Sequence, residues 1–208
     1  MIPSVSINTF LALGTGAIVG IAIGVVVLIL IIWVISMYNG LVRTRQSCRE
    51  SWADIDTELN RRHDLIPNLV NCVKGYAKHE ADVMNAVTDL RGKAMGAKDA
   101  SAADRSHVEG ALEQGVGKLM MVAENYPDLK ASTNFLELQK ELSETETRIA
   151  RARRFYNSNV RSLHNSCEMF PSSIIAGMGG FKSDEYSFFQ ADDGSRAPVA
   201  VDFGAGTS

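Results

Sequence analysis

The residues of this chain that could hold a metal or act as nucleophiles do not have the spacing that such chemistry needs. His79 and Glu80 begin like the His-Glu-x-x-His zinc motif, but position 83, where the second histidine belongs, holds Val83. No phosphate-binding glycine loop and no Gly-x-Ser-x-Gly motif is present. Three cysteines without ligand spacing are interpreted as buried or idle thiols: Cys48, Cys72 and Cys167. We therefore predict no metal, no cofactor and no catalytic residue.

One polar cluster remains, formed by Arg61, Arg62 and Asp64. Together with Glu146 from a distant segment, it could form the site of an unrecognised enzyme, or it could hold helices together as ion pairs. We favour the structural role, because charges at seam positions of a helical bundle need partners.

The chain divides by charge into an apolar lead and a charged body. Residues 1–42 contain no Lys, Arg, Asp, Glu or His, and the net charge of −3 argues against a nucleic-acid binder. Residues 17–38 are uniformly apolar; as a helix they would measure about 33 Å, enough for a bilayer core of about 30 Å. A cleaved signal peptide would need a basic start, a shorter apolar run and small residues before a cut site. We therefore predict a short uncharged segment over residues 1–16 and a retained transmembrane helix over residues 17–38.

Residues on and beside this helix indicate its orientation and its contacts. No Lys or Arg precedes it and three arginines follow it, which places the N-terminus outside and the body in the cytoplasm: Arg43, Arg45 and Arg49. Gly16, Gly20 and Gly24 repeat every four residues and would let another helix approach closely. Glycine is also simply common in membrane helices, but three in register favour self-association, and we predict a homo-oligomer.

Apolar residues recur at intervals of three and four through the body, which predicts an all-α fold. One such seam covers residues 52–90, a shorter one residues 112–126 and a third residues 135–156. We expect an antiparallel bundle of three or four long helices over residues 39–170, the first continuous or nearly so with the transmembrane helix. Pro67 is either a kink or the first turn of a new helix, and the unbroken phase of the seam slightly favours the kink.

Interruptions of the seams suggest how the helices are paired. Arg62 occupies an apolar position of the first seam, and Glu146 lies at the interruption of the last one. Antiparallel pairing would make these two a buried ion pair and would bring Arg153 near Asp54 or Asp56, with the role of fixing the register. The alternative is that Arg62 extends to solvent.

The same register predicts how charge is distributed along the body. Acidic residues, Glu109 among them, would gather at the end far from the membrane. A basic collar would face anionic headgroups at the near end, unless these residues are only a solvated face: Arg43, Arg45, Arg49, Arg151, Arg154 and Arg161.

An apolar, glycine-rich segment over residues 171–189 follows the bundle. The register places it at the membrane surface, where it would lie in the interface or pack under a neighbouring subunit through four residues: Ile174, Ile175, Met178 and Phe181. Residues 190–208 are expected to form an exposed tail.

Several motifs in a fixed order resemble the LemA family over roughly residues 37 to 189. They include Trp52-x-x-Ile55-Asp56, Arg61-Arg62-x-Asp64-Leu65-Ile66-Pro67, Glu124-x-Tyr126-Pro127 and Thr145-Glu146-x-x-Ile149-Ala150. The resemblance implies a single-pass protein of the bacterial inner membrane with a helical body and no known enzyme activity. Family members are often found beside membrane metalloproteases, and one branch serves magnetosome formation.

Three functional hypotheses follow from the sequence. The chain could be a self-assembling membrane scaffold in envelope organisation or membrane remodelling, an adaptor or regulator of a membrane metalloprotease, or an unrecognised enzyme using the arginine cluster. We favour the scaffold, because the glycine face and the long seams are present and catalytic motifs are not.

Overall fold

The computed structural model describes residues 6–77 and 79–189, with side chains from residue 17 onward. Helices and turns make up these ranges, in which there is no strand, so the all-α prediction is confirmed. Residues 1–5 and 190–208, to which the sequence assigned part of the uncharged N-terminal segment and the tail, lie outside the described residues.

A single helix of 71 residues, α1 (Ser6–Tyr76), joins the apolar lead to the charged body. Pro67 lies inside this helix and does not mark a boundary. The expectation that the first seam continues unbroken to residue 90 is wrong, because α1 ends at Tyr76. That side chain is 46% exposed, and Ala77 takes the buried position.

In the described part of the chain, α1 is followed by five further helices and a short 3-10 turn. They are α2 (Ala81–Gly96), α3 (Ala102–Ala123), α4 (Pro127–Lys130), α5 (Thr133–Glu168), α6 (Ser172–Met178) and η1 (Ser183–Glu185). The boundaries have local causes. Ser101 caps α3 by accepting a hydrogen bond of 3.1 Å from the backbone N–H of Asp104, and Pro127 occupies the first turn of α4.

The chain forms two compact units, and α1 and α5 each contribute to both. Unit 1 combines the part of α1 up to Arg45 with Leu163–Ser183, and unit 2 combines Gln46–Ser162 with the chain from Asp184 onward.

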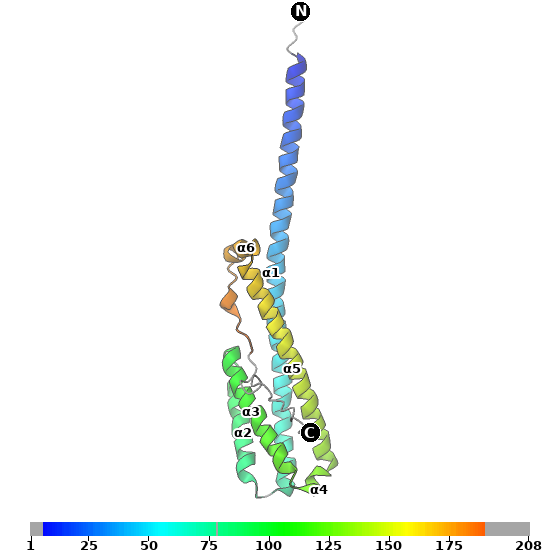
Figure 1. Cartoon of the computed structure of the whole chain (residues 1–208), viewed down its shortest axis with the longest axis vertical. Helices are drawn as coiled ribbons and strands as arrows, with labels where there is room; N and C mark the ends of the chain where they lie inside the picture. The colour runs from blue at the N-terminus through cyan, green and yellow to red at the C-terminus, as the bar shows by residue number, and fades with distance from the viewer. Residues whose placement is uncertain (1–5, 78, 190–208) are drawn as a thin grey trace, which may run out of the picture. The chain divides into compact units, whose positions relative to one another are not determined.

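Unit 2 is a helical bundle around an aliphatic core. α2 and α3 lie side by side as a hairpin, and the unit 2 portions of α1 and α5 complete the bundle (Figure 1). Its buried core includes Ile66, Leu69, Val87, Leu112 and Leu142. The seams predicted from the sequence supply all five, so the period of three and four identified the buried face correctly.

Unit 1 has a much smaller core at the end of the apolar run. Leu41 of α1 is buried together with Ile175 and Ala176 of α6 and with Phe181, and Met37 packs against this cluster. These contacts hold α6 against α1 (Figure 1).

Candidate functional site

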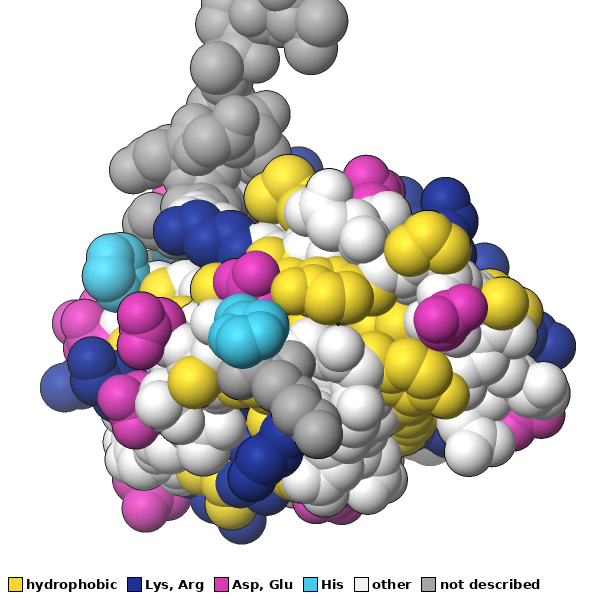
Figure 2. Space-filling view, turned by 90° about the horizontal axis from the view of Figure 1, so that it is seen from below, with side chains coloured by type: hydrophobic (Ala, Val, Ile, Leu, Met, Phe, Trp, Pro, Cys, Tyr) yellow, Lys and Arg dark blue, Asp and Glu magenta, His cyan; other side chains and the backbone are white. Residues whose placement is uncertain are grey.

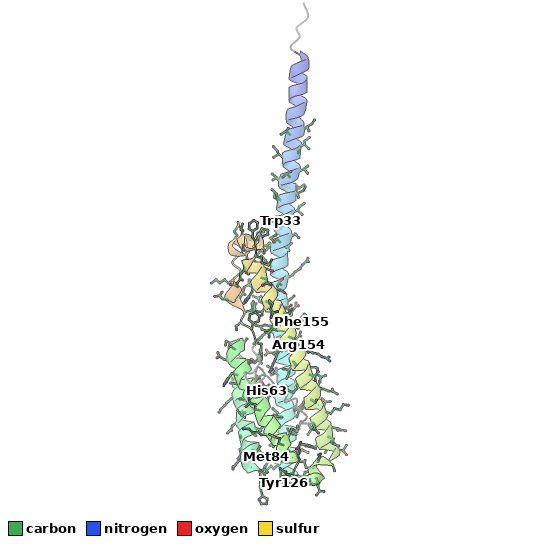
Figure 3. The ribbon with its side chains drawn as sticks, viewed as in Figure 1. Trp33, His63, Met84, Tyr126, Arg154 and Phe155 are labelled. Atoms are coloured by element: carbon green, nitrogen blue, oxygen red, sulfur yellow. The ribbon has the colours of Figure 1, made fainter. Side chains whose placement is uncertain are left out.

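The apolar part of α1 is exposed over nearly its whole described length, and the half-buried Met37 at its end is the exception. It contains an 18-residue window with mean hydropathy 3.3, of which nothing is buried, so among the described residues this one helix is long and apolar enough to cross a membrane. Figure 3 shows side chains pointing outward on both flanks of this part of α1. Because an apolar surface of this size is unfavourable in water, it needs a lipid or protein environment.

The glycine face predicted for membrane contacts lies on this exposed stretch. A Cβ atom placed at Gly20 or Gly24 would meet nothing within 4 Å, so neither glycine is needed for packing within the chain. Gly16 is part of α1, but its surroundings lie outside the described side chains.

The structure divides the predicted membrane-proximal residues into two pairs. Ile175 and Phe181 are buried in the unit 1 core, where the Phe181 ring meets Tyr38 edge-on with centroids 5.7 Å apart. Arg45 lies over the same ring, 5.6 Å from its centroid. Ile174 and Met178 are exposed. Two of the four residues therefore attach α6 to α1, and the other two face away from the fold.

A buried ion network occupies the centre of unit 2. The side chain of Arg62 is fully buried, and its guanidinium binds Glu146 with Nη1 and Oε1 2.9 Å apart. The other terminal nitrogen of Arg62 binds Glu109, whose side chain is also fully buried. His63 joins the same carboxylate, with Nε2 3.1 Å from Oε1. The structure thus brings Arg62 and Glu146 together in the register expected from the sequence, and excludes the alternative in which Arg62 reaches solvent.

Glu109 is the member of this network that sequence reasoning missed. It was expected among the acidic residues at the far end, whereas α3 carries it into the core. One signal could have indicated this place, since Glu109 stands between Arg105 and Leu112 at the spacing of the α3 buried face.

The electrostatics of the network keep both partners charged. Burial alone opposes the charge on Glu109, but the hydrogen bond from His63 and the charge of Arg62 outweigh it, so the pKa of Glu109 lies below its ordinary value. Burial likewise opposes the charge on Arg62, and the carboxylates of Glu146 and Glu109 raise its pKa above the usual value.

The expected proximity of Arg153 to Asp54 or Asp56 does not give an ion pair, because α3 supplies a different partner. Asp56 binds Arg105, which is itself buried and lies over the Trp52 ring at 5.3 Å. Arg153 instead lies 4.7 Å above the Phe189 ring. Burial, and then the nearby charge of Arg62, lower the pKa of Arg153. Pairing of two seams alone gave the wrong partner, since it left out the third helix.

The arginines predicted to form a basic collar are distributed over both units. Arg43 and Arg45 belong to unit 1 and the other four to unit 2. Arg49 donates a hydrogen bond of 3.1 Å to the Tyr186 hydroxyl, and Arg154 donates to a backbone carbonyl. Figure 2 shows acidic, basic and apolar side chains mixed over the view from below, so the expected separation of charge is not visible on that face.

The described part of the chain offers no candidate metal centre. It contains no group of three or more His, Cys, Asp and Glu side chains placed to hold a metal. Cys48 is buried, and desolvation, followed by the charge of Glu185, raises the pKa of its thiol to about 11. The Arg62 and Glu109 side chains are closed to solvent, so no substrate can reach them. The burial of Arg62 favours a structural role for this residue, whereas Arg61 and Asp64 of the same cluster are exposed.

Comparison with known proteins decides the family. The LemA family matches residues 51–203, well over half of the chain. The chain belongs to the LemA family. Magnetosome protein MamQ of Magnetospirillum gryphiswaldense is 23% identical over 192 residues, covering 80% of this chain and 70% of the relative. Protein LemA of Metamycoplasma hominis is 26% identical over 163 residues, covering 77% and 72%.

Family membership agrees with the architecture described above. The matched range begins in α1 of unit 2 and includes Arg62, Glu109 and Glu146, so the ion network lies within the LemA region. Together with the exposed apolar part of α1, membership of this family fits a membrane-associated protein.

Proposed function

We propose that this LemA-family chain is a non-enzymatic, membrane-anchored scaffold of the bacterial inner membrane that self-assembles into homo-oligomers. The observation that carries the proposal is the exposed apolar part of α1, which continues without a break into a bundle whose central charges are paired with one another. Such a chain offers a lipid-facing anchor and a rigid body, and its buried charges are not available for chemistry.

The relatives support an organising role. The relative from Magnetospirillum gryphiswaldense is named a magnetosome protein. Envelope organisation or membrane remodelling is a role that a membrane-anchored helical bundle can perform without catalytic groups.

The contact between copies is proposed to involve the transmembrane helix and the helical body. Gly20 and Gly24 lie one turn apart with open space above both, so a second helix can approach the backbone of α1 closely there. The N-terminus is proposed to lie outside and unit 2 in the cytoplasm, because Arg43, Arg45 and Arg49 follow the apolar run.

The particle mass of the full chain, extracted from native membranes into lipid nanodiscs, tests the proposal. Gly20→Leu adds bulk on the glycine face, and Ala22→Leu adds it about 200° around the helix as the matched control. We expect a multiple of the chain mass that Gly20→Leu reduces and Ala22→Leu preserves.

Each other outcome changes the conclusion in a defined way. An assembly that survives both substitutions would move the contact to the helical body or to α6. A monomer would refute the scaffold. A small complex with an unrelated protein would also refute it and would favour the adaptor of a membrane metalloprotease.

A further inference from the structure

Unit 1 exposes an apolar surface beside the anchor helix. Phe170, which precedes α6, is 80% exposed, and Met178 at the end of α6 is 85% exposed. Ile174 lies between them in the chain and is also exposed. Residues 174 and 178 are one helical turn apart and so share one side of α6. Three large side chains of one short segment therefore lack cover from the fold.

The position of this surface is fixed by contacts on the other side of the segment. Ile175, Ala176 and Phe181 are buried against Leu41 and its neighbours on α1. A closely fitted turn follows α6, because a Cβ at Gly179 would lie 2.9 Å from the Phe181 ring. The exposed residues are thus held at a defined place along α1.

That place is the end of the apolar run. Tyr38, the last residue of the run, touches the Phe181 ring, and Trp33 lies close to α6 along the axis of α1 (Figure 3). Aromatic side chains of this kind prefer the headgroup region of a bilayer. If α1 spans the membrane over residues 17–38, α6 lies at the boundary between headgroups and acyl chains.

We propose that α6 is a second membrane contact, in which Phe170, Ile174 and Met178 insert into the lipid surface. The inference rests on the anchoring part of the proposed function and not on self-assembly. Charge supports lipid as the occupant, because the exposed Arg43 and Lys182 flank the unit 1 core and suit anionic headgroups. Apolar residues combined with basic neighbours are typical of segments that lie in the membrane interface.

Site-directed spin labelling of the full chain tests this inference. The protein is reconstituted in vesicles of phosphatidylcholine and phosphatidylglycerol after its three cysteines are replaced, and a nitroxide is attached through Met178→Cys. Collision with oxygen, which concentrates in lipid, is compared with collision with a water-soluble nickel chelate. Met121→Cys, at a 61% exposed position of α3, is the matched control, and Val26→Cys reports on the anchor itself.

We expect the oxygen-to-nickel collision ratio at position 178 to be several-fold higher than at 121 and closer to that at 26. A ratio at 178 equal to that at 121 would overturn the inference while leaving the anchor intact. Low collision with both reagents, together with spin–spin broadening that disappears on dilution with unlabelled protein, would show that a second copy covers α6, which also overturns it. A water-facing label at position 26 would overturn this inference and the anchoring together.

Discussion

Removal of the buried carboxylate of Glu109 tests most directly whether Arg62 and Glu109 form a buried ion pair that the fold depends on. Glu109→Gln keeps the shape of the side chain but leaves the buried guanidinium of Arg62 with Glu146 as its remaining charged partner. Breaking a fully buried pair from one side costs about 3–5 kcal/mol. Because Glu146 stays in place and glutamine can still accept a hydrogen bond, we expect a loss of about 3 kcal/mol, at the lower end of that range.

Two matched substitutions separate burial from charge. Glu146→Gln removes the other partner of Arg62, but the Glu146 side chain is 35% exposed, so the expected loss is about 1 kcal/mol or less. Glu141→Gln breaks an ion pair of 2.5 Å with Arg61, in which both side chains are almost half exposed, and we expect no measurable change.

Urea unfolding of the full chain in detergent micelles measures these losses. The chain has two tryptophans, so Trp33→Phe leaves Trp52, which contacts Tyr156 and Arg105 in unit 2, as the reporter. At a slope of about 2 kcal/mol per molar urea, Glu109→Gln should lower the midpoint by about 1.5 M.

A double replacement provides the test that could refute this reasoning. Arg62→Met combined with Glu109→Leu removes both buried charges, and such exchanges are often neutral or stabilising. The double variant should therefore be more stable than Glu109→Gln alone. If it is less stable, or if Glu109→Gln behaves like Glu141→Gln, the network is not the buried ion pair described above.

Three further predictions concern pH, thiol chemistry and the α6 turn. Because the pKa of Glu109 is lowered, the contribution of its charge to stability is present above pH 4.5, the ordinary carboxylate pKa, and is lost as the pH falls through the lower pKa of the folded state. The free energy of unfolding should therefore fall less steeply with decreasing pH in Glu109→Gln than in the unchanged protein. Cys48, buried and with a thiol pKa of about 11, should react with iodoacetamide at neutral pH far more slowly than Cys72, as peptide mass spectrometry would measure. A Cβ at Gly179 would meet the Phe181 ring at 2.9 Å, so Gly179→Ala should speed hydrogen exchange in α6 without moving the Trp52 unfolding transition. Gly177 has open space around it, so Gly177→Ala should leave both the exchange rate and the transition unchanged.

The fold could largely be predicted from the sequence because helical packing leaves a periodic trace. The interval of three and four marked Ile66, Leu69 and Leu142 as buried, and the absence of charge marked the exposed apolar part of α1. The end of α1 at Tyr76 left no such trace. The apolar spacing continues across the turn into α2, and no proline or glycine marks the break between Ala77 and Glu80.

The site was predictable only where two helices define it. An arginine at an apolar position and a glutamate at the interruption of the opposite seam pointed to the contact between Arg62 and Glu146. Glu109 and the pairing of Arg105 with Asp56 depend on how α3 is placed around the first two helices. Spacing within one seam contains no information about that placement, so Glu109 could not be inferred as a partner of Arg62. For the same reason the sequence assigned Asp56 to Arg153, whereas α3 supplies Arg105 as the partner of Asp56.

This difference bears on what the network would do for the proposed scaffold. A buried Arg62 surrounded by two carboxylates and His63 adds little net stability compared with an apolar core, because desolvation offsets the attraction between the charges. Its effect is to select one register of the helices, because sliding α1 against α3 or α5 by one turn would leave a buried charge without a partner. A single allowed register gives every copy of the bundle the same surface, which is the property that repeated assembly requires. In the proposed scaffold, the network and the apolar part of α1 would thus meet separate requirements, a uniform body and a lipid-facing attachment.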